Sequence, residues 1–180
     1  MEQVNSNIIA GCKKGDRKSQ ELLYRNYYKA MMALCLMYTK NDADAVEVLN
    51  GGFLKVFLNL HRYDPTHANL YTWIRTIIIN NCLDFIKSKS RNQQPGELNR
   101  AIEVYINAEA IEKMDAAMLL DLVRKLPPAT QAVFQLYVIE GYNHKEIGSL
   151  VHISEGTSKW HLSEARKSLQ QMIRMQEVKL

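Results

Sequence analysis

The sequence predicts an all-α protein of two small helical domains joined by a linker, the C-terminal one a helix-turn-helix. Glycine and proline are scarce, with 8 and 4 occurrences in 180 residues, so helix breakers are few. Apolar residues recur at spacings of three and four, and no long segment alternates apolar with polar residues as a half-buried strand would. These patterns favour helices throughout, and the 47% hydrophobic content is enough to form a core.

The first domain is expected to span residues 1–92 and to begin with two helices within 6–40. Asp16 is placed to cap the second of these, because its carboxylate can accept a hydrogen bond from an unpaired N–H of the first turn. Asp42 or Asp44 can begin the next helix in the same way. The first half of the domain is therefore expected to consist of three consecutive helices.

Two adjacent glycines, Gly51 and Gly52, lie inside the third expected helix. Each is unfavourable there by roughly 1 kcal/mol relative to alanine, so we expect either a kink or a very closely packed neighbour. The turn signal Asp64-Pro65 separates this helix from a long one over 70–91. That long helix ends in a run of cations, which suits a helix C-terminus and also suits phosphate groups.

The polar segment 93–112 contains a Pro-Gly turn signal and is the expected linker. The formal net charge is +4 and is unevenly distributed. Residues 1–92 carry a net +5, residues 93–115 a net −3, and residues 116–180 a net +2. Two positive segments around a short acidic one suit two domains that contact a polyanion and a linker that does not.

The second domain, residues 113–180, is expected to begin with two helices that end at a proline pair and at a glycine. Asn143, with Glu146 three residues later, forms a capping-box signal for a short third helix. Ser154 follows a tight turn and can cap the last helix. Two helices joined by a tight turn, with a polar outer face on the second, are typical of a helix-turn-helix.

The last helix has an inner and an outer face. Ser158, Leu162, Ala165 and Leu169 share one side, which is small or apolar and is expected to pack inward. The other side combines Trp160 with cations and short polar groups, and a solvated face would rarely carry a tryptophan. This composition suits the major groove of DNA, where a dry inner face and a polar outer face are needed. Packing of Trp160 against the other domain or a protein partner is the alternative.

Other function classes find little support in the sequence. Cys12, Cys35 and Cys82 have no metal-like spacing and form no cluster with the five histidines, so we expect small buried side chains and no metal or cofactor. No nucleophile–base set or phosphate loop points to an enzyme. The N-terminus lacks a signal pattern and the apolar runs fall short of the about 20 residues that span a membrane. We therefore expect a cytoplasmic protein with no membrane contact of its own.

Both halves of the chain resemble the conserved regions of extracytoplasmic-function (ECF) sigma factors of the sigma-70 superfamily. The C-terminal half shares Leu126-Pro127, Glu140-Gly141, Tyr142, Glu146-Ile147, Gly156-Thr157 and Ala165-Arg166 with Leu169. The N-terminal half shares Phe53, Lys55, Phe57, Trp73, Ile77, Asn80 and Asp84. The resemblance covers nearly the whole chain in order, with the linker between the two regions.

The resemblance implies a sigma factor, which is not an enzyme and needs no cofactor. Such a protein binds core RNA polymerase, directs it to specific promoters and assists promoter melting. Residues 1–92 would be sigma region 2, which binds core polymerase and the minus-ten element. Residues 113–180 would be sigma region 4, which binds the minus-thirty-five element. The implied partners are core RNA polymerase, promoter DNA and an anti-sigma factor.

The resemblance also implies three sets of contact residues. Those expected at the minus-thirty-five element are Thr157, Ser158, Lys159, Trp160, His161, Ser163, Glu164, Arg166 and Lys167. Those expected at the minus-ten element and in melting are His61, Arg62, Tyr63, Asp64, His67, Asn69, Tyr71, Trp73, Arg75, Asn80, Lys87, Lys89 and Arg91. Those expected to bind core polymerase are Asp44, Glu47, Val48, Asn50, Gly51, Phe53, Leu54 and Phe57.

The chain departs from the family pattern at several positions. Asn50 and Gly51 occupy places where the family usually has a glutamine followed by an acid, and Glu164 stands where many relatives have an arginine. His152 replaces the usual glycine of the turn, where a left-handed backbone would be strained. Two other classes of protein stay open: a DNA-binding regulator that does not recruit polymerase, and a helical protein that acts only through other proteins.

Overall fold

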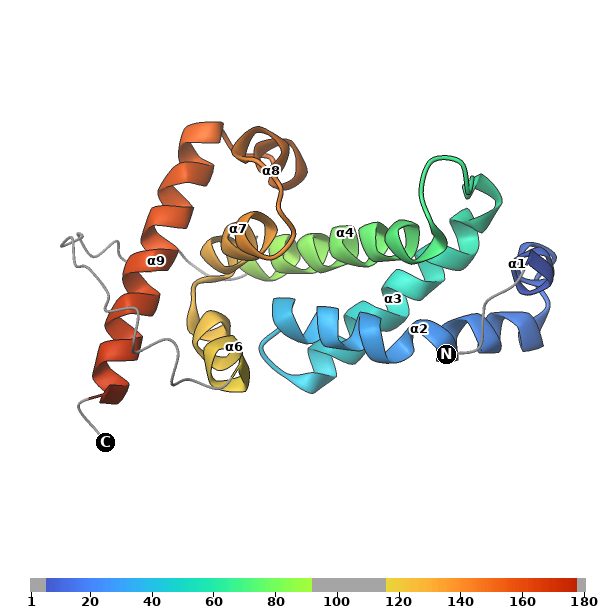
Figure 1. Cartoon of the computed structure of the whole chain (residues 1–180), viewed down its shortest axis with the longest axis horizontal. Helices are drawn as coiled ribbons and strands as arrows, with labels where there is room; N and C mark the ends of the chain where they lie inside the picture. Colours follow the sequence, from blue (N-terminus) through green and yellow to red (C-terminus); the bar gives the residue numbers. More distant parts are fainter. Residues whose placement is uncertain (1–5, 92–115, 178–180) are drawn as a thin grey trace. The chain divides into compact units, whose positions relative to one another are not determined.

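The structure is a computed structural model that describes residues 6–91 and 116–177, without the side chains of 90–91, 116–117 and 176–177 (Figure 1). The elements in chain order are α1 (Ser6–Lys13), α2 (Arg17–Tyr38), α3 (Asp42–Asn59), the 3-10 turn η1 (Leu60–Arg62), α4 (Leu70–Arg91), α6 (Ala116–Lys125), α7 (Pro128–Val138), α8 (His144–Val151) and α9 (Glu155–Glu177). Within these two stretches every regular element is helical, which confirms the predicted fold class.

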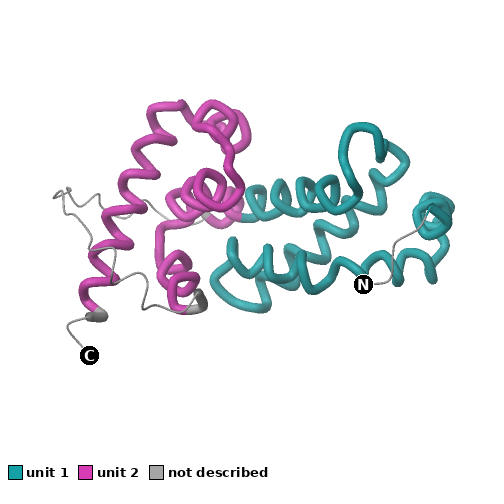
Figure 2. Tube along the Cα trace, in the orientation of Figure 1, with its two compact units in different colours: residues 1–85 teal, residues 86–180 magenta. Residues whose placement is uncertain are grey.

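The chain divides into two compact units, residues 1–85 and residues 86–180 (Figure 2). The division falls inside α4, so Lys87 and Lys89 belong to the second unit. The expected linker at 93–112 lies outside the described residues. Each unit has its own buried core, and the two are therefore described separately.

The core of the first unit is formed where α2, α3 and α4 meet. Leu23 and Met31 of α2, Phe53 of α3, and Ile74 and Ile78 of α4 are all buried. Burying a side chain of this size contributes about 1.5–3 kcal/mol each relative to exposure. The apolar periodicity of the three helices thus serves one common interior.

The two glycines of α3 mark a close helix–helix approach, and α3 is continuous through both. A Cβ on Gly52 would overlap Cδ1 of Ile78, and one on Gly51 would lie 3.1 Å from Asn81 Nδ2. Asn81 Nδ2 donates a hydrogen bond of 2.8 Å to the carbonyl oxygen of Val48. Of the two expected alternatives, a kink or a closely packed neighbour, the second is confirmed.

The helix starts follow the predicted capping residues with one correction. Asp16 Oδ2 accepts from the Ser19 N–H at 2.9 Å, as expected. The third helix is capped by Asn41, whose Oδ1 accepts from the Asp44 N–H at 2.8 Å, and Asp42 lies in the first turn. The helix therefore begins at Asp42, one of the two expected starting residues, but the residue that caps it is Asn41. The amide oxygen of Asn41 satisfies the N–H instead, and the acids meet the positive end of the helix dipole.

The second unit contains the predicted helix-turn-helix, formed by α8 and α9 (Figure 1). The capping box of Asn143 and Glu146 is present at the start of α8. Ser154 Oγ accepts from the Thr157 N–H at 3.0 Å and so caps α9. His152, between the helices, has φ 58° and ψ 48°, which is the left-handed conformation that its position suggested.

Replacement of His152 by glycine is expected to stabilise the second unit by about 0.5–1 kcal/mol, because glycine adopts the left-handed region without a Cβ penalty. Denaturant unfolding followed by circular dichroism measures the change. His152→Ala keeps the Cβ and is the matched control, for which we expect little gain. A His152→Gly variant less stable than wild type would contradict the strain argument.

Candidate nucleic-acid and polymerase interfaces

The outer side of α9 presents an aromatic ring among polar and charged groups. Trp160 is 43% exposed, and its ring meets that of His161 edge-on, with the centroids 4.8 Å apart. Lys159, Ser163 and Arg166 are exposed on the same helix, and Thr157 is exposed near its start. Glu164 and Lys167 are half-buried. An aromatic face beside cations is suited to bases, sugars and phosphates, and it agrees with the outward orientation expected for Trp160.

Two residues of the predicted recognition surface face inward. Ser158 is fully buried, and its Oγ lies 2.9 Å from His144 Nδ1. His161 is half-buried, and its Nδ1 lies 3.0 Å from the hydroxyl of Thr130 in α7. Ser158 therefore cannot touch DNA in this structure and is withdrawn from the candidate surface, because it follows the packed stripe of α9. His161 links α9 to α7 and is better regarded as a positioning residue.

Burial lowers the pKa of His161 below its usual value, and nearby Glu164 opposes this only in part. The folded unit therefore prefers the neutral ring and binds fewer protons than the unfolded chain does near the usual histidine pKa of about 6.5. We expect the stability contributed by His161 to be complete above that pH and to fall as the pH drops below it. Unfolding measured from pH 8 to 5 tests this.

The control for the pH experiment is His161→Gln, which keeps polar atoms at this position but does not titrate. We expect the variant to lose less stability than wild type between pH 7 and 5. Equal losses in the two proteins would mean that His161 is not the group responsible.

The charges at the start of α9 are partly matched within the helix. Lys159 Nζ lies 2.7 Å from Glu155 Oε1, and the lysine holds the pKa of that carboxyl below its usual value. The Thr157 N–H donates its hydrogen bond to the Ser154 hydroxyl, so it is not available to hold a phosphate. Arg166 is exposed on the same surface, and it is therefore the cation that we propose first as a phosphate contact.

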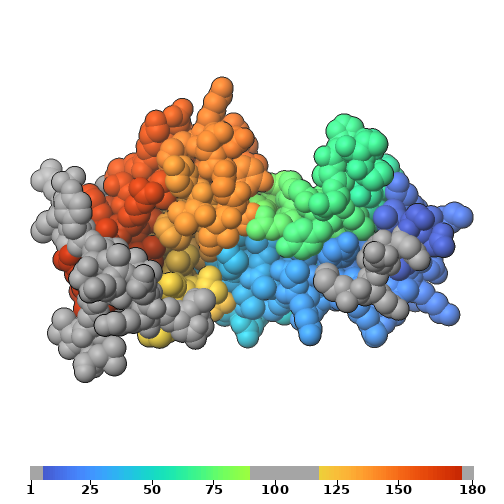
Figure 3. All heavy atoms as spheres, viewed as in Figure 1, coloured from blue at the N-terminus to red at the C-terminus, as the bar shows by residue number. Residues whose placement is uncertain are grey.

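The loop between η1 and α4 projects from the first unit (Figure 3). Asp64 Oδ1 accepts from the N–H and the hydroxyl of Thr66 at 2.8 and 2.7 Å, and Asp64 Oδ2 lies 3.3 Å from His67 Nδ1. The hydrogen bonds from Thr66, followed by the charge of His67, lower the pKa of Asp64. Asp64 thus organises the loop as a carboxylate acceptor, while His61 and His67 are exposed.

Two other predicted minus-ten residues of this region, Asn69 and Tyr63, have structural roles. Asn69 Oδ1 accepts from the Thr72 N–H at 2.8 Å and caps α4. Tyr63 is only 8% exposed and packs on Trp73, with the ring centroids 5.4 Å apart. Tyr63 therefore supports Trp73 from the core and is withdrawn as a direct contact. Tyr71 is 41% exposed and remains available.

The structure brings three of the predicted residues together in one groove of about 320 Å³ in the first unit. Its lining residues are Lys55, Asn59, Arg62, Trp73, Ile77 and Asn80. Lys55 and Asn59 were missed from the sequence as site residues. Lys55, Asn59 and Arg62 follow one another at i, i+4 and i+7, and the three lining residues on α4 have the same spacing. This spacing places each set on one side of the chain, so the sequence could have indicated both sets.

The remaining predicted residues of α4 are Arg75, Lys87, Lys89 and Arg91. Arg75 is half-buried on α4 of the first unit. Lys87 is half-buried and Lys89 is exposed, and both lie in the second unit. The side chain of Arg91 lies outside the described residues. Arg75 is not among the residues that line the groove.

The predicted polymerase-binding residues of α3 divide between surface and core. Glu47, Asn50 and Leu54 are exposed, and Asp44, Gly51 and Phe57 are half-buried. Val48 and Phe53 are each only 2% exposed, so they are withdrawn as contacts. Phe53 packs on the Tyr24 ring, and Val48 lies with it on the buried side of α3.

Asn50, one of the departures from the family pattern, has a defined partner. The Tyr24 hydroxyl donates a hydrogen bond of 3.0 Å to Asn50 Oδ1. The carbonyl end of this amide is therefore engaged within the unit. The side chain offers its N–H groups to solvent as donors.

The described residues contain no group of three or more His, Cys, Asp and Glu side chains arranged to hold a metal ion. The three cysteines are buried with free thiols. Of the helices in 6–91 and 116–177, none has the length and apolar character needed to cross a membrane.

Comparison with known families identifies the chain. The model of Sigma-70 region 2 matches residues 23–92, and that of Sigma-70 region 4 matches residues 116–169. The chain therefore belongs to the sigma-70 family. Within it, the relatives place the chain with the ECF type of sigma factor.

Two of the relatives are similar over nearly their whole lengths. The RNA polymerase sigma-H factor of Pseudomonas aeruginosa is 21% identical, with 96% of this chain and 97% of the relative covered. The ECF RNA polymerase sigma factor SigM of Bacillus subtilis is 22% identical, over 82% and 90%.

Two solved structures have the same fold. The sigma factor RpoE, in complex with the anti-sigma factor NepR from Bartonella quintana, has a TM-score of 0.55 and 15% identity, with 86% of this chain and 96% of that chain covered. CnrH, in complex with the cytosolic domain of CnrY, has a TM-score of 0.51 and 16% identity, over 96% and 99%.

Proposed function

We propose that the chain is a promoter-specific initiation factor that binds core RNA polymerase, directs it to particular promoters and assists melting of the duplex. The observation that carries this proposal is the presence of both sigma regions in order on one chain, at residues 23–92 and 116–169. A regulator that bound DNA without polymerase would leave the polymerase-docking part of the first region without a role. The proposed role requires no catalytic group of its own and places the protein in the cytoplasm, where bacterial polymerase acts.

The proposed contacts use the residues that the structure leaves accessible. Glu47, Asn50 and Leu54 on α3 would dock on polymerase. The loop with His61 and His67 would contact the unpaired minus-ten strand, because a melted base offers both its edges and a face for stacking. The neighbouring groove, which contains Trp73, would contact the same strand.

The second unit would read the minus-thirty-five element through the outer face of α9. The exposed residues of that surface that would contact the DNA are Thr157, Trp160, Ser163 and Arg166. The net charge of +4 is modest for a DNA-binding protein, since affinity rises with the number of phosphates neutralised. Modest charge suits a factor that should bind promoters only while polymerase holds it.

An anti-sigma factor is proposed as the regulatory partner. RpoE and CnrH share the fold, and each was solved in complex with another protein. The partner of RpoE is an anti-sigma factor, and that of CnrH is the cytosolic domain of CnrY. An inhibitor that covered the exposed face of α3 would compete with polymerase directly. Mixing the chain with a candidate inhibitor and measuring the loss of polymerase binding tests this.

The function is tested by mixing the purified chain with core RNA polymerase from its own host. We expect the two to co-elute, and transcripts made in vitro on genomic DNA to start at discrete sites that share two upstream elements. If the two co-elute but transcripts do not start at discrete sites, the chain binds polymerase but does not direct it to promoters. Absence of co-elution would favour the regulator that does not recruit polymerase.

A further inference from the structure

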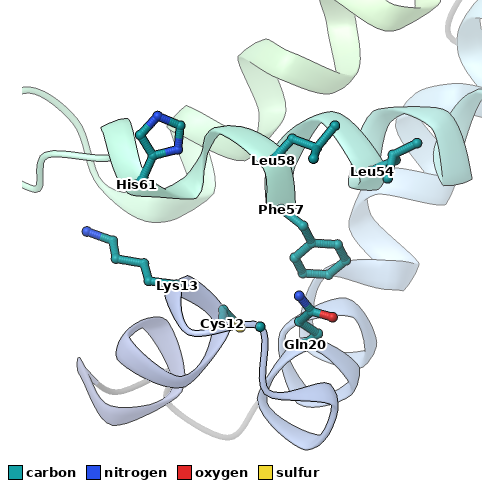
Figure 4. A pocket seen from close by; sticks show the side chains of 8 residues that line it. Cys12, Lys13, Gln20, Leu54, Phe57, Leu58 and His61 are labelled. Carbon is teal, nitrogen blue, oxygen red and sulfur yellow. The ribbon is translucent and has the colours of Figure 1, made fainter.

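A groove of about 400 Å³ in the first unit lies between α1, the start of α2, the C-terminal half of α3 and η1 (Figure 4). Its lining residues are Cys12, Lys13, Gly15, Gln20, Leu54, Phe57, Leu58 and His61. The contacts proposed above use only the α3 and η1 side of this groove, at Leu54 and His61. They give no role to the α1 side.

The α1 side of the groove belongs to a short segment rich in exposed cations, which we call the basic strip. Its members are Lys13 and Lys14 at the end of α1 and Arg17 and Lys18 at the start of α2. None of the four forms an ion pair with another residue that the structure describes. By contrast, Arg25 further along α2 lies 2.7 Å from Glu21. The charge of the basic strip is therefore available to an anion from outside the chain.

The one acid inside this segment is engaged as a helix cap. Asp16 Oδ2 accepts hydrogen bonds from the N–H and the hydroxyl of Ser19 at 2.9 and 2.6 Å, and so caps α2. Residues 13–18 thus contain four cations and a single carboxylate, and the segment keeps an excess of positive charge.

Two of the cations are placed where they weaken their own helix. Arg17 and Lys18 begin α2, whose first turn contains no acid. The N-terminal end of a helix carries a partial positive charge, so a cation is unfavourable there and an anion is favourable. Residues that break a local rule of stability without an internal gain are expected where a chain contacts another molecule.

The basic strip continues the surface proposed for the minus-ten strand. Helix α1 packs against η1, and Lys13 reaches toward His61 of η1 across the opening (Figure 4). Arg62, the next residue of η1, is exposed and lines the groove that contains Trp73. A strand held at the minus-ten loop and near Trp73 therefore finds the next cations on α1 and α2.

The chemistry of the basic strip suits a sugar–phosphate backbone. Its four side chains are long cations with no aromatic ring among them, so they can meet phosphates but offer no platform for stacking bases. The apolar groups that a protein partner would cover, Leu54 and Leu58, are 60% and 65% exposed on the α3 side of the groove. The α3 side therefore suits polymerase, and the α1 side suits nucleic acid.

We propose that the basic strip binds the sugar–phosphate backbone of the melted promoter strand beyond its minus-ten contacts. The inference rests on the proposed function and adds to it a DNA contact on α1 and α2. Phosphate contacts fix the position of a strand without reading its bases, so this contact is independent of base sequence. Each neutralised phosphate adds affinity that falls as the salt concentration rises.

The experiment uses the full chain assembled with core polymerase of its own host and a promoter fragment that is mismatched, and so already melted, from the minus-ten element onward. Lys13→Gln/Arg17→Gln is expected to weaken DNA binding about tenfold at low salt and to lower the slope of log K against log salt by about 0.7 for each lost phosphate contact. The loss should be the same for different base sequences beyond the minus-ten element.

A second fragment, whose melted strand ends at the minus-ten element, locates the contact. On this fragment the double variant is expected to bind as wild type does, because the phosphates that the basic strip would hold are missing. The affinity of the variant for core polymerase alone should also equal that of wild type.

The matched control is Arg25→Gln/Lys29→Gln, which removes one arginine and one lysine from the exposed surface of α2 outside the basic strip. It is expected to bind core polymerase and both fragments as wild type does. All four substituted positions are exposed, so both double variants should unfold close to wild type, which circular dichroism verifies.

Three results would overturn the inference. If Lys13→Gln/Arg17→Gln weakens binding to core polymerase itself, the basic strip contacts protein. If the variant binds the long fragment as wild type does, or loses equal affinity for the two fragments, the basic strip does not hold the strand beyond the minus-ten element, while the proposed function stands. If wild type does not bind polymerase, the proposed function fails as well.

Discussion

Gly148→Ala is expected to destabilise the second unit by about 1–3 kcal/mol and to abolish promoter recognition through α9, because the turn of the helix-turn-helix leaves no room for a methyl group. A Cβ on Gly148 would lie 2.8 Å from the carbonyl oxygen of Ile153. The Ile153 N–H also donates to the Gly148 carbonyl oxygen at 3.0 Å. The backbone of the turn would have to move, and α9 would move with it. Denaturant unfolding and transcription in vitro measure the two effects.

The matched control is Gly156→Ala, in the first turn of α9. A Cβ there would meet only Ser154 Oγ, at 3.7 Å. Alanine is favoured over glycine in a helix by up to about 1 kcal/mol, so this variant is expected to be as stable as wild type or more stable. Equal destabilisation by the two substitutions would show that the crowding at Gly148 is not the cause.

Trp160→Ala is expected to lower promoter-specific transcription about tenfold while leaving the second unit folded. In the major groove of a duplex the ring would lie against a thymine methyl or a sugar, and a tenfold loss corresponds to about 1.4 kcal/mol of lost apolar contact. The ring is 43% exposed, so its removal leaves no large cavity in the core. Runoff transcription from a cognate promoter, together with thermal unfolding, measures both quantities.

Met175→Ala is the control for the tryptophan variant, because Met175 is a 68% exposed apolar residue near the other end of α9. It should leave transcription unchanged. A Trp160→Ala protein whose second unit unfolds would show that the ring is structural. A folded variant with full transcription would remove Trp160 from the DNA interface.

Much of the helix-turn-helix could be predicted because its signals are local. Asn143, Glu146 and Ser154 satisfy N–H groups within three residues of themselves, so their roles depend little on the rest of the fold. The left-handed backbone at His152 could also be expected, because the chain must turn sharply in the few residues that connect the two helices. The outward position of Trp160 follows from the inward position of Leu162 and Ala165.

The polymerase contacts on α3 could not be assigned in the same way. Val48 and Phe53 belong to an apolar stripe at spacings of three and four that leaves out Leu54, which agrees with the burial of the first two and the 60% exposure of Leu54. Val48 and Phe53 were nevertheless assigned to an interface by the resemblance, which points to a helix and does not separate its outer side chains from its buried ones. That separation depends on how α2 and α4 pack against α3.

The sequence by itself determined the helices, most of their caps, the order of two sigma regions and the side of α9 that faces outward, because each depends on residues within one or two turns or on a motif of fixed spacing. The tertiary structure alone decided that Ser158 binds His144, that His161 binds Thr130, and that Gly52 makes room for Ile78. It also decided that α1 and α3 form the groove around Leu58. These pairings join residues on different helices, and their free energies depend on contacts that exist only once the helices have packed.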